Sequence, residues 1–175
     1  TGFTVTGAEV AETVTHPEFR SGIADRSNAW TAIEVDCGSQ PACSVAIRFA
    51  DGTGTVLAVL KDFIGNIAVS SGGVSNVTFD PSRSNWRFGD FAAERERLSS
   101  LRANVATSAR YGVFRFDGTR SQRSSQAEQL ADKIRVLKGF DPTLGLYAAY
   151  AYWEADLMPK VQSVREYMRG DLDVD

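Results

Sequence analysis

Residues 139–153 limit the fold of this chain more than any other segment, because they are apolar on nearly all sides. Gly139 suits the left-handed residue that ends a helix. Asp141 can cap the next helix, and Pro142 fits the first turn of that helix. A helix without a polar face must be covered on several sides, by its own domain or by a partner. The segment therefore predicts packing and assembly more than chemistry.

The size and composition of the chain are those of a globular protein. Its 175 residues allow one large domain or two small ones. Hydrophobic residues make up 43% of the chain and charged residues 23%, which is ordinary for a folded domain. No run of 18 apolar residues and no leader-like segment occurs, so we expect no membrane partner and a cytoplasmic location. The chain begins with Thr1, and we expect it to be a piece of a longer protein.

Most of the N-terminal half shows the period-two alternation of half-buried strands. Glycine-containing turns at 51–54 and 71–73 separate the runs at hairpin spacing. Before these runs, residues 3–5 indicate a first strand, whereas Val10 and Val14 have the spacing of a short helix. The pattern predicts an antiparallel, sandwich-like arrangement. The expected later strands are 31–37, 45–49, 55–60, 64–69 and 74–79.

After Pro81 the period changes to that of helices. One face of a helix between Asp90 and Arg110 is marked by Phe91, Leu98, Leu101 and Val105. Residues 111–116 indicate a strand and residues 117–124 a polar loop, after which a capping box at 125–128 starts a helix that runs up to Gly139. The apolar helix extends to about Met158, and Pro159 starts a last helix that Gly170 closes. The chain is thus predicted to be α+β, with a β-rich half at 1–85 and a mainly helical half at 86–175, either as two domains or as one continuous domain.

The net charge of −3 hides an asymmetry along the chain. Residues 1–80 hold nine acidic and four basic side chains, whereas residues 81–123 hold nine arginines against four acids. The 83–123 arginine segment could therefore bind nucleic acid or phosphate. The alternative is a solvated helix face with internal ion pairs, which we favour because nucleic-acid-binding domains usually carry a basic overall balance.

Cys37 and Cys43 are the only cysteines, and His16 is the only histidine. The two thiols can form a small disulfide across a hairpin or stay free and buried. Zinc needs about four ligands, so we expect neither a metal nor a cofactor. Gln40-Pro41-Ala42-Cys43 is partly similar to a caspase nucleophile motif, which makes a thiol peptidase using Cys43 and His16 one alternative. Because Pro41 interrupts the motif, we prefer two cysteines that flank a turn, and no catalytic residue is assigned.

Aromatic and arginine side chains that gather along the second half are the best candidates for partner contacts. Protein interfaces are enriched in both residue types. Four aromatic residues of the apolar helix point in several directions, so that one neighbouring helix cannot cover them all. The candidate partner-binding residues are Trp86, Phe88, Arg95, Arg102, Tyr147, Tyr150 and Trp153.

Three stretches together resemble the non-catalytic region of large bacterial proteins that often carry a caspase-like or other peptidase domain elsewhere. They are 51–54 (Asp-Gly-Thr-Gly), 76–83 and 138–152, and the resemblance covers roughly residues 30–170. It implies an accessory module, with catalysis in another domain. We therefore expect a non-enzymatic interaction or scaffold module. Its partner would be another domain of the parent protein, another protein, or a second copy of the chain.

Overall fold

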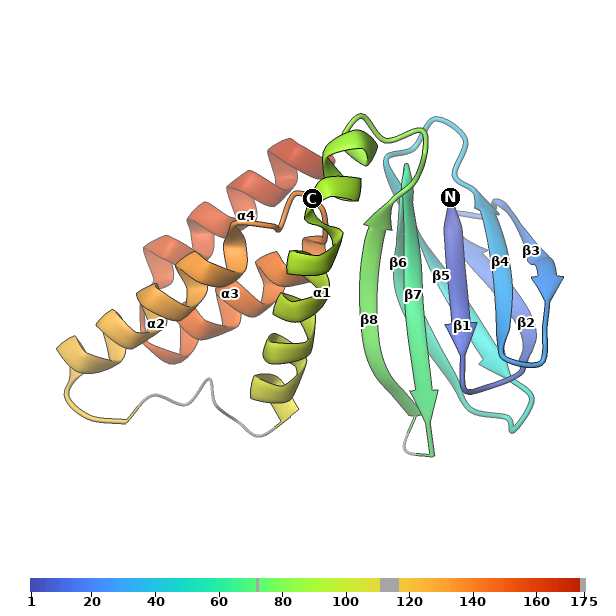
Figure 1. The fold of residues 1–175 in the computed structure, drawn as a ribbon. Coiled ribbons are helices and arrows are strands. Elements are labelled where there is room, and N and C mark those ends of the chain that lie inside the picture. Colours follow the sequence, from blue (N-terminus) through green and yellow to red (C-terminus); the bar gives the residue numbers. More distant parts are fainter. Residues whose placement is uncertain (72, 111–116, 174–175) are drawn as a thin grey trace. The chain divides into compact units, whose positions relative to one another are not determined.

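The computed structural model describes residues 1–71, 73–110 and 117–173, and these form two compact units, Thr1–Phe88 and Gly89–Asp175. The first unit contains two β-sheets and the second is helical (Figure 1). The α+β class predicted from the sequence is therefore confirmed. Each unit has its own core and is described separately.

The first unit is a two-layer β-structure, with a five-stranded sheet in the order β3-β4-β1-β7-β8 and a three-stranded sheet in the order β2-β5-β6. Neighbouring strands are antiparallel except β1 and β7, which run parallel. The strands are β1 (Gly2–Thr6), β2 (Val10–His16), β3 (Arg20–Arg26), β4 (Trp30–Asp36), β5 (Ala42–Phe49), β6 (Gly54–Leu60), β7 (Phe63–Ser70) and β8 (Gly73–Pro81).

The core of this unit lies between the two sheets and follows directly from the alternation in the sequence. Every second residue of β5 is buried, and β4 buries Ile33 and Val35 in the same way. Successive strand side chains point to opposite faces, so one face of each strand supplies the core. The buried residues of β5 are Cys43, Val45, Ile47 and Phe49.

Two strands near the N-terminus differ from the sequence prediction. Residues 10–16, where the spacing of Val10 and Val14 allowed a short helix, form β2, which pairs with β5 from Val10 to His16. β3 was not predicted at all. Both are end strands of their sheets and pair on one side only, so their main-chain hydrogen bonds, and not a buried apolar face, hold most of their length.

The helices of the second unit are α1 (Phe88–Arg110), α2 (Arg120–Arg135), α3 (Pro142–Glu154) and α4 (Met158–Leu172). The predicted start of α2 is wrong. The capping box is formed by Thr119 with Gln122 and not by Ser125 with Glu128. Residues 120–124, expected in a loop, are therefore helical. α2 also ends at Arg135, before Gly139. The strand predicted at 111–116 lies outside the described residues.

α2, α3 and α4 pack in sequence order, with α3 in contact with both of its neighbours (Figure 1). The residues of α2 that are buried are Ala127, Ala131 and Ile134. Small alanine side chains let α2 approach α3 closely. Across the described part of the chain, none of the helices has the length and apolar character needed to cross a membrane.

Candidate interaction surface

Asp141 positions the start of α3. Its carboxylate accepts hydrogen bonds from the Thr143 backbone N–H at 3.0 Å and from Thr143 Oγ1 at 2.7 Å, which is the predicted N-cap. Arg102 Nε of α1 donates to the other carboxylate oxygen at 2.6 Å. Asp141 is fully buried, and this burial raises the pKa of its carboxyl group although Arg102 and Thr143 act in the opposite direction. The pair therefore joins α1 to the first turn of α3.

Tyr152 fixes how α3 is rotated against α2. Its ring is fully buried, and its hydroxyl donates to Asp132 Oδ1 at 3.2 Å and accepts from Arg135 Nη1 at 3.4 Å. The hydrogen bond to Tyr152 raises the pKa of the Arg135 guanidinium above its ordinary value. A buried tyrosine needs such partners for its hydroxyl. With Tyr152 held inward, together with Leu144, the opposite face of α3 must point outward.

That outward face carries three large apolar side chains, Leu146, Tyr150 and Trp153, which we call the α3 stripe. Their exposed fractions are 54%, 60% and 56%. The spacing of four and then three residues keeps them within about 60° of one another around the helix. Single exposed apolar residues are common on protein surfaces, whereas a contiguous group suggests an interaction site. The stripe is therefore the candidate surface.

The predicted partner-binding residues separate into different environments. Tyr150 and Trp153 lie together on the α3 stripe, whereas Tyr147 is half-buried, and burial together with the Asp141 carboxylate raises the pKa of its hydroxyl. Arg102 pairs with Asp141 and is only 18% exposed at its side chain. The sequence reasoning did not select Leu146, although its spacing from Tyr150 and Trp153 was a signal that could have found it.

The remaining candidates belong to both units. Trp86 and Phe88 lie at the end of the first unit, where Trp86 is exposed and the Arg87 guanidinium lies 4.2 Å from its ring centroid. Arg95, in α1, is exposed and lies 5.3 Å from the ring centroid of Phe91. Their roles as partner contacts stay predictions.

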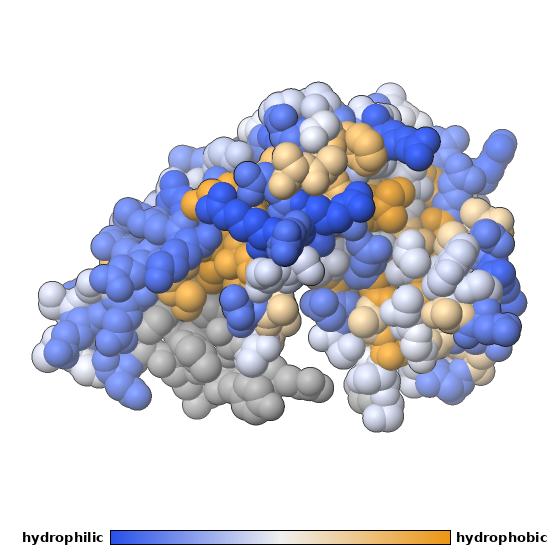
Figure 2. Space-filling model, in the orientation of Figure 1, coloured by the Kyte–Doolittle hydropathy of each residue, from blue (hydrophilic) through white to orange (hydrophobic). Residues whose placement is uncertain are grey.

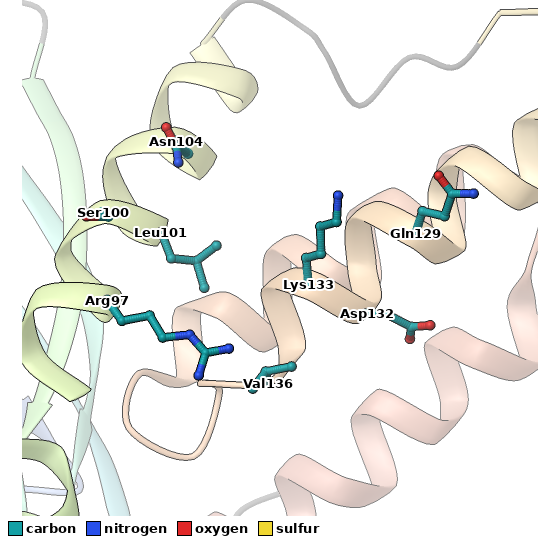
Figure 3. Close-up of a pocket in the computed structure, with 8 residues that line it drawn as sticks. All are labelled: Arg97, Ser100, Leu101, Asn104, Gln129, Asp132, Lys133 and Val136. Atoms are coloured by element: carbon teal, nitrogen blue, oxygen red, sulfur yellow. The ribbon is translucent and has the colours of Figure 1, made fainter. Parts of the chain in front are cut away.

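A groove of about 700 Å³ runs between α1 and α2 (Figure 3). Arg97 and Leu101 extend toward it from α1. Lys133 of α2 and Val136, the residue directly after α2, line the other side. Arg97 is paired with Glu94 at 3.4 Å, and Asp132 accepts from Tyr152. The groove thus combines a small apolar floor with a mixed rim of charges. Figure 2 shows the same mixture more widely, with hydrophilic side chains over most of the helices in view and small apolar patches between them.

The geometry around Cys43 does not supply the base that a thiol nucleophile needs. His16 is paired in register with Ser44, which faces outward, while Cys43 faces the core. The two side chains are therefore on opposite faces of the sheet. Burial, together with the adjacent Cys37 thiol, raises the pKa of Cys43 to about 12, so that it keeps its proton at neutral pH. Among the described residues, no group of three or more His, Cys, Asp or Glu side chains could hold a metal ion.

Comparison of the chain with protein-family models, with curated proteins and with solved structures gives no match. Any statement about function must therefore come from the chain's own residues.

Proposed function

We propose that this chain is a non-enzymatic protein-interaction module and that the α3 stripe is its docking surface. One observation carries the proposal: Leu146, Tyr150 and Trp153 expose more than half of their surface on one side of a helix whose other side is locked by Tyr152 and Asp141. Aromatic side chains on a rigid helix are effective interface anchors, because little conformational freedom is lost when they are covered.

The partner that the stripe fits best is a second copy of the chain. Glu154 is the only charged residue of α3, so two such faces can approach without repulsion at their centre. The stripe extends four residues before Tyr150 and three after it. In an antiparallel pairing about a two-fold axis, Leu146 of one copy would therefore meet Trp153 of the other, while the two Tyr150 side chains lie near the axis. An apolar face on a neighbouring domain of a longer bacterial protein is the other candidate partner.

Sedimentation velocity over a wide concentration range tests this proposal. We expect the wild-type chain to associate reversibly, and Trp153→Ala to weaken association roughly 1,000-fold, because a two-fold pairing loses two buried anchors of about 2 kcal/mol each. Val56→Ala is the matched control, because Val56 is a 69% exposed apolar residue of β6. Circular dichroism would establish that both variants are folded.

Two results would contradict the proposal. A wild-type chain that stays monomeric at every concentration would exclude the second copy as partner. Equal weakening by Val56→Ala and Trp153→Ala would show that association does not depend on the α3 stripe.

A further inference from the structure

The end of β4 and the start of β5 bring the two cysteines of the chain together. Cys37 directly follows β4, Cys43 is the second residue of β5, and their Sγ atoms lie 3.5 Å apart. Both are buried, with 4% and 7% of their surface exposed. The chain contains no other cysteine, so neither thiol has a competing partner within it.

The turn between the two cysteines holds them in this position. The backbone N–H of Gln40 donates to the Cys37 carbonyl at 3.0 Å, and Gly38 adopts a φ of 57°, which glycine tolerates without strain. The Gly38 N–H also donates to the Asp36 carboxylate at 2.9 Å. The strand pairing of Cys43 with Val59 of β6 fixes the other end. The main chain therefore holds both cysteines in the position where their sulfur atoms lie 3.5 Å apart.

This turn also joins the two layers of the first unit. β4 belongs to the five-stranded sheet and β5 to the three-stranded sheet. A covalent bond between the sulfur atoms would close a short loop between residues six positions apart. It would tie the end of β4 in one sheet to the start of β5 in the other. To form this bond the sulfur atoms must approach from 3.5 Å to about 2 Å.

We propose that Cys37 and Cys43 are a modification site, at which a disulfide-type oxidant converts the two thiols into one intramolecular disulfide. One cysteine thiolate attacks the oxidant's disulfide, which forms a mixed disulfide and releases one oxidant thiol. The second cysteine thiolate then attacks the protein sulfur of the mixed disulfide and releases the other oxidant thiol. In total, the two protein thiols lose two electrons and two protons, and the oxidant disulfide is reduced to two thiols.

The surroundings of the pair also predict how fast this reaction proceeds. Both sulfur atoms are enclosed, and Cys43 stays protonated at neutral pH. Since only the thiolate reacts, exchange in the folded chain is slow. The closed loop restricts the unfolded chain, so the oxidised form is the more stable one.

The test uses the whole chain with oxidised glutathione as the oxidant. After incubation, the chain is unfolded, treated with an alkylating reagent and weighed by mass spectrometry. We expect a chain that has lost two hydrogen atoms and takes up no reagent, with a peptide map that links Cys37 to Cys43. We also expect the oxidised chain to melt about 5 °C or more above the reduced chain.

The double variant Cys37→Ser with Cys43→Ser is the control, and its melting temperature should not respond to the oxidant. Because the main comparison is between two redox forms of one polypeptide, failure of a variant to fold does not affect it. Two free thiols after an incubation long enough for the slow exchange to reach equilibrium, a persistent glutathione adduct, or a disulfide between two chains would each overturn the proposal. This result is independent of whether the α3 stripe docks a partner.

Discussion

At the scale of single residues, the carboxylate of Asp141 has two structural tasks. It caps α3 through Thr143 and pairs with Arg102 of α1, while no part of it reaches solvent. Removing one partner of a buried ion pair is costly because the other charge is left without compensation. The position of α3, and therefore of the stripe it carries, depends on this one side chain.

We expect Asp141→Ala to lower the free energy of unfolding by about 3 kcal/mol, because it removes both the cap of α3 and an ion-pair partner of Arg102. Asp141→Asn keeps an acceptor for the cap, so its free energy of unfolding should lie between that of Asp141→Ala and that of the wild type. Urea unfolding measures both effects. Glu94→Ala, which removes an exposed pair with Arg97, is the control and should cost less than about 0.5 kcal/mol. Equal losses for Asp141→Ala and Glu94→Ala would contradict the assignment.

Cys43 leads to a prediction about pH for the reduced chain. In the unfolded state its thiol loses a proton near the ordinary pKa of 9.0, whereas burial keeps it protonated in the folded state up to about pH 12. Above pH 9 the unfolded state therefore binds fewer protons than the folded state, and the free energy of unfolding decreases as the pH rises. Urea unfolding at several pH values above and below 9, with reductant present, measures this decrease relative to Cys43→Ala. A difference between the two proteins that does not change with pH would show that burial does not hold the proton.

At the scale of elements, the parallel pairing of β1 with β7 places Phe3 opposite Gly65. The Phe3 ring occupies the space where a Cβ of residue 65 would lie, and it packs edge-on against Phe79 with ring centroids 6.2 Å apart. Phe3 is buried, so it cannot move aside without disturbing the core. The glycine is thus part of how the aromatic side chains fill the space between the sheets.

Gly65→Ala should lower the free energy of unfolding by about 2 kcal/mol, because the added methyl group overlaps the Phe3 ring and the core must shift. Gly22→Ala is the matched control, since Gly22 also lies in a strand and has open space where a Cβ would be. Thermal unfolding of the two variants measures the difference. A Gly65→Ala variant as stable as Gly22→Ala would mean that the ring has room to move.

Elements with a strong apolar period could be predicted from the sequence, and others could not. β4 and β5 alternate clearly because one face of each is buried. β3 contains Arg20, Asp25 and Arg26 and is mostly exposed, so its sequence carries almost no period. The start of α2 was missed because two capping boxes a few residues apart fit the sequence, and only the hydrogen bonds between Thr119 and Gln122 distinguish them.

The candidate surface could be predicted only in part, for a related reason. A helix that is apolar all round has no polar face to show which side is outward. The sequence therefore marked Tyr147, Tyr150 and Trp153 alike, although Tyr147 is half-buried and the other two are exposed. The hydrogen bonds of Tyr152 to Asp132 and Arg135 decide the rotation of α3. These are contacts between helices, which no local pattern contains.

At the scale of the whole molecule, the overall charge and the exposed apolar surface both favour the proposed protein partner over a nucleic acid. The chain carries a net charge of −3. Within the arginine-rich segment, Arg97 pairs with Glu94 and Arg102 with Asp141, so both already have local partners. Long-range attraction to a phosphate polymer requires a positive field that this chain lacks overall. The exposed aromatic surface on α3 is therefore the feature on which the proposed docking rests.

Fluorescence of Trp153 as the single tryptophan tests the central claim most directly. Trp30→Phe with Trp86→Phe removes the other two tryptophans. For the dilute chain we expect the long-wavelength emission of a solvent-exposed indole, since Trp153 is 56% exposed. As the concentration rises, docking of the α3 stripe onto a second copy should shift the emission to shorter wavelengths, and Tyr150→Ala should move that shift to higher concentration.

Emission at short wavelength already in the dilute, monomeric chain would show that Trp153 is enclosed within its own domain. Emission that stays at long wavelength at every concentration would show that a second copy does not cover the stripe.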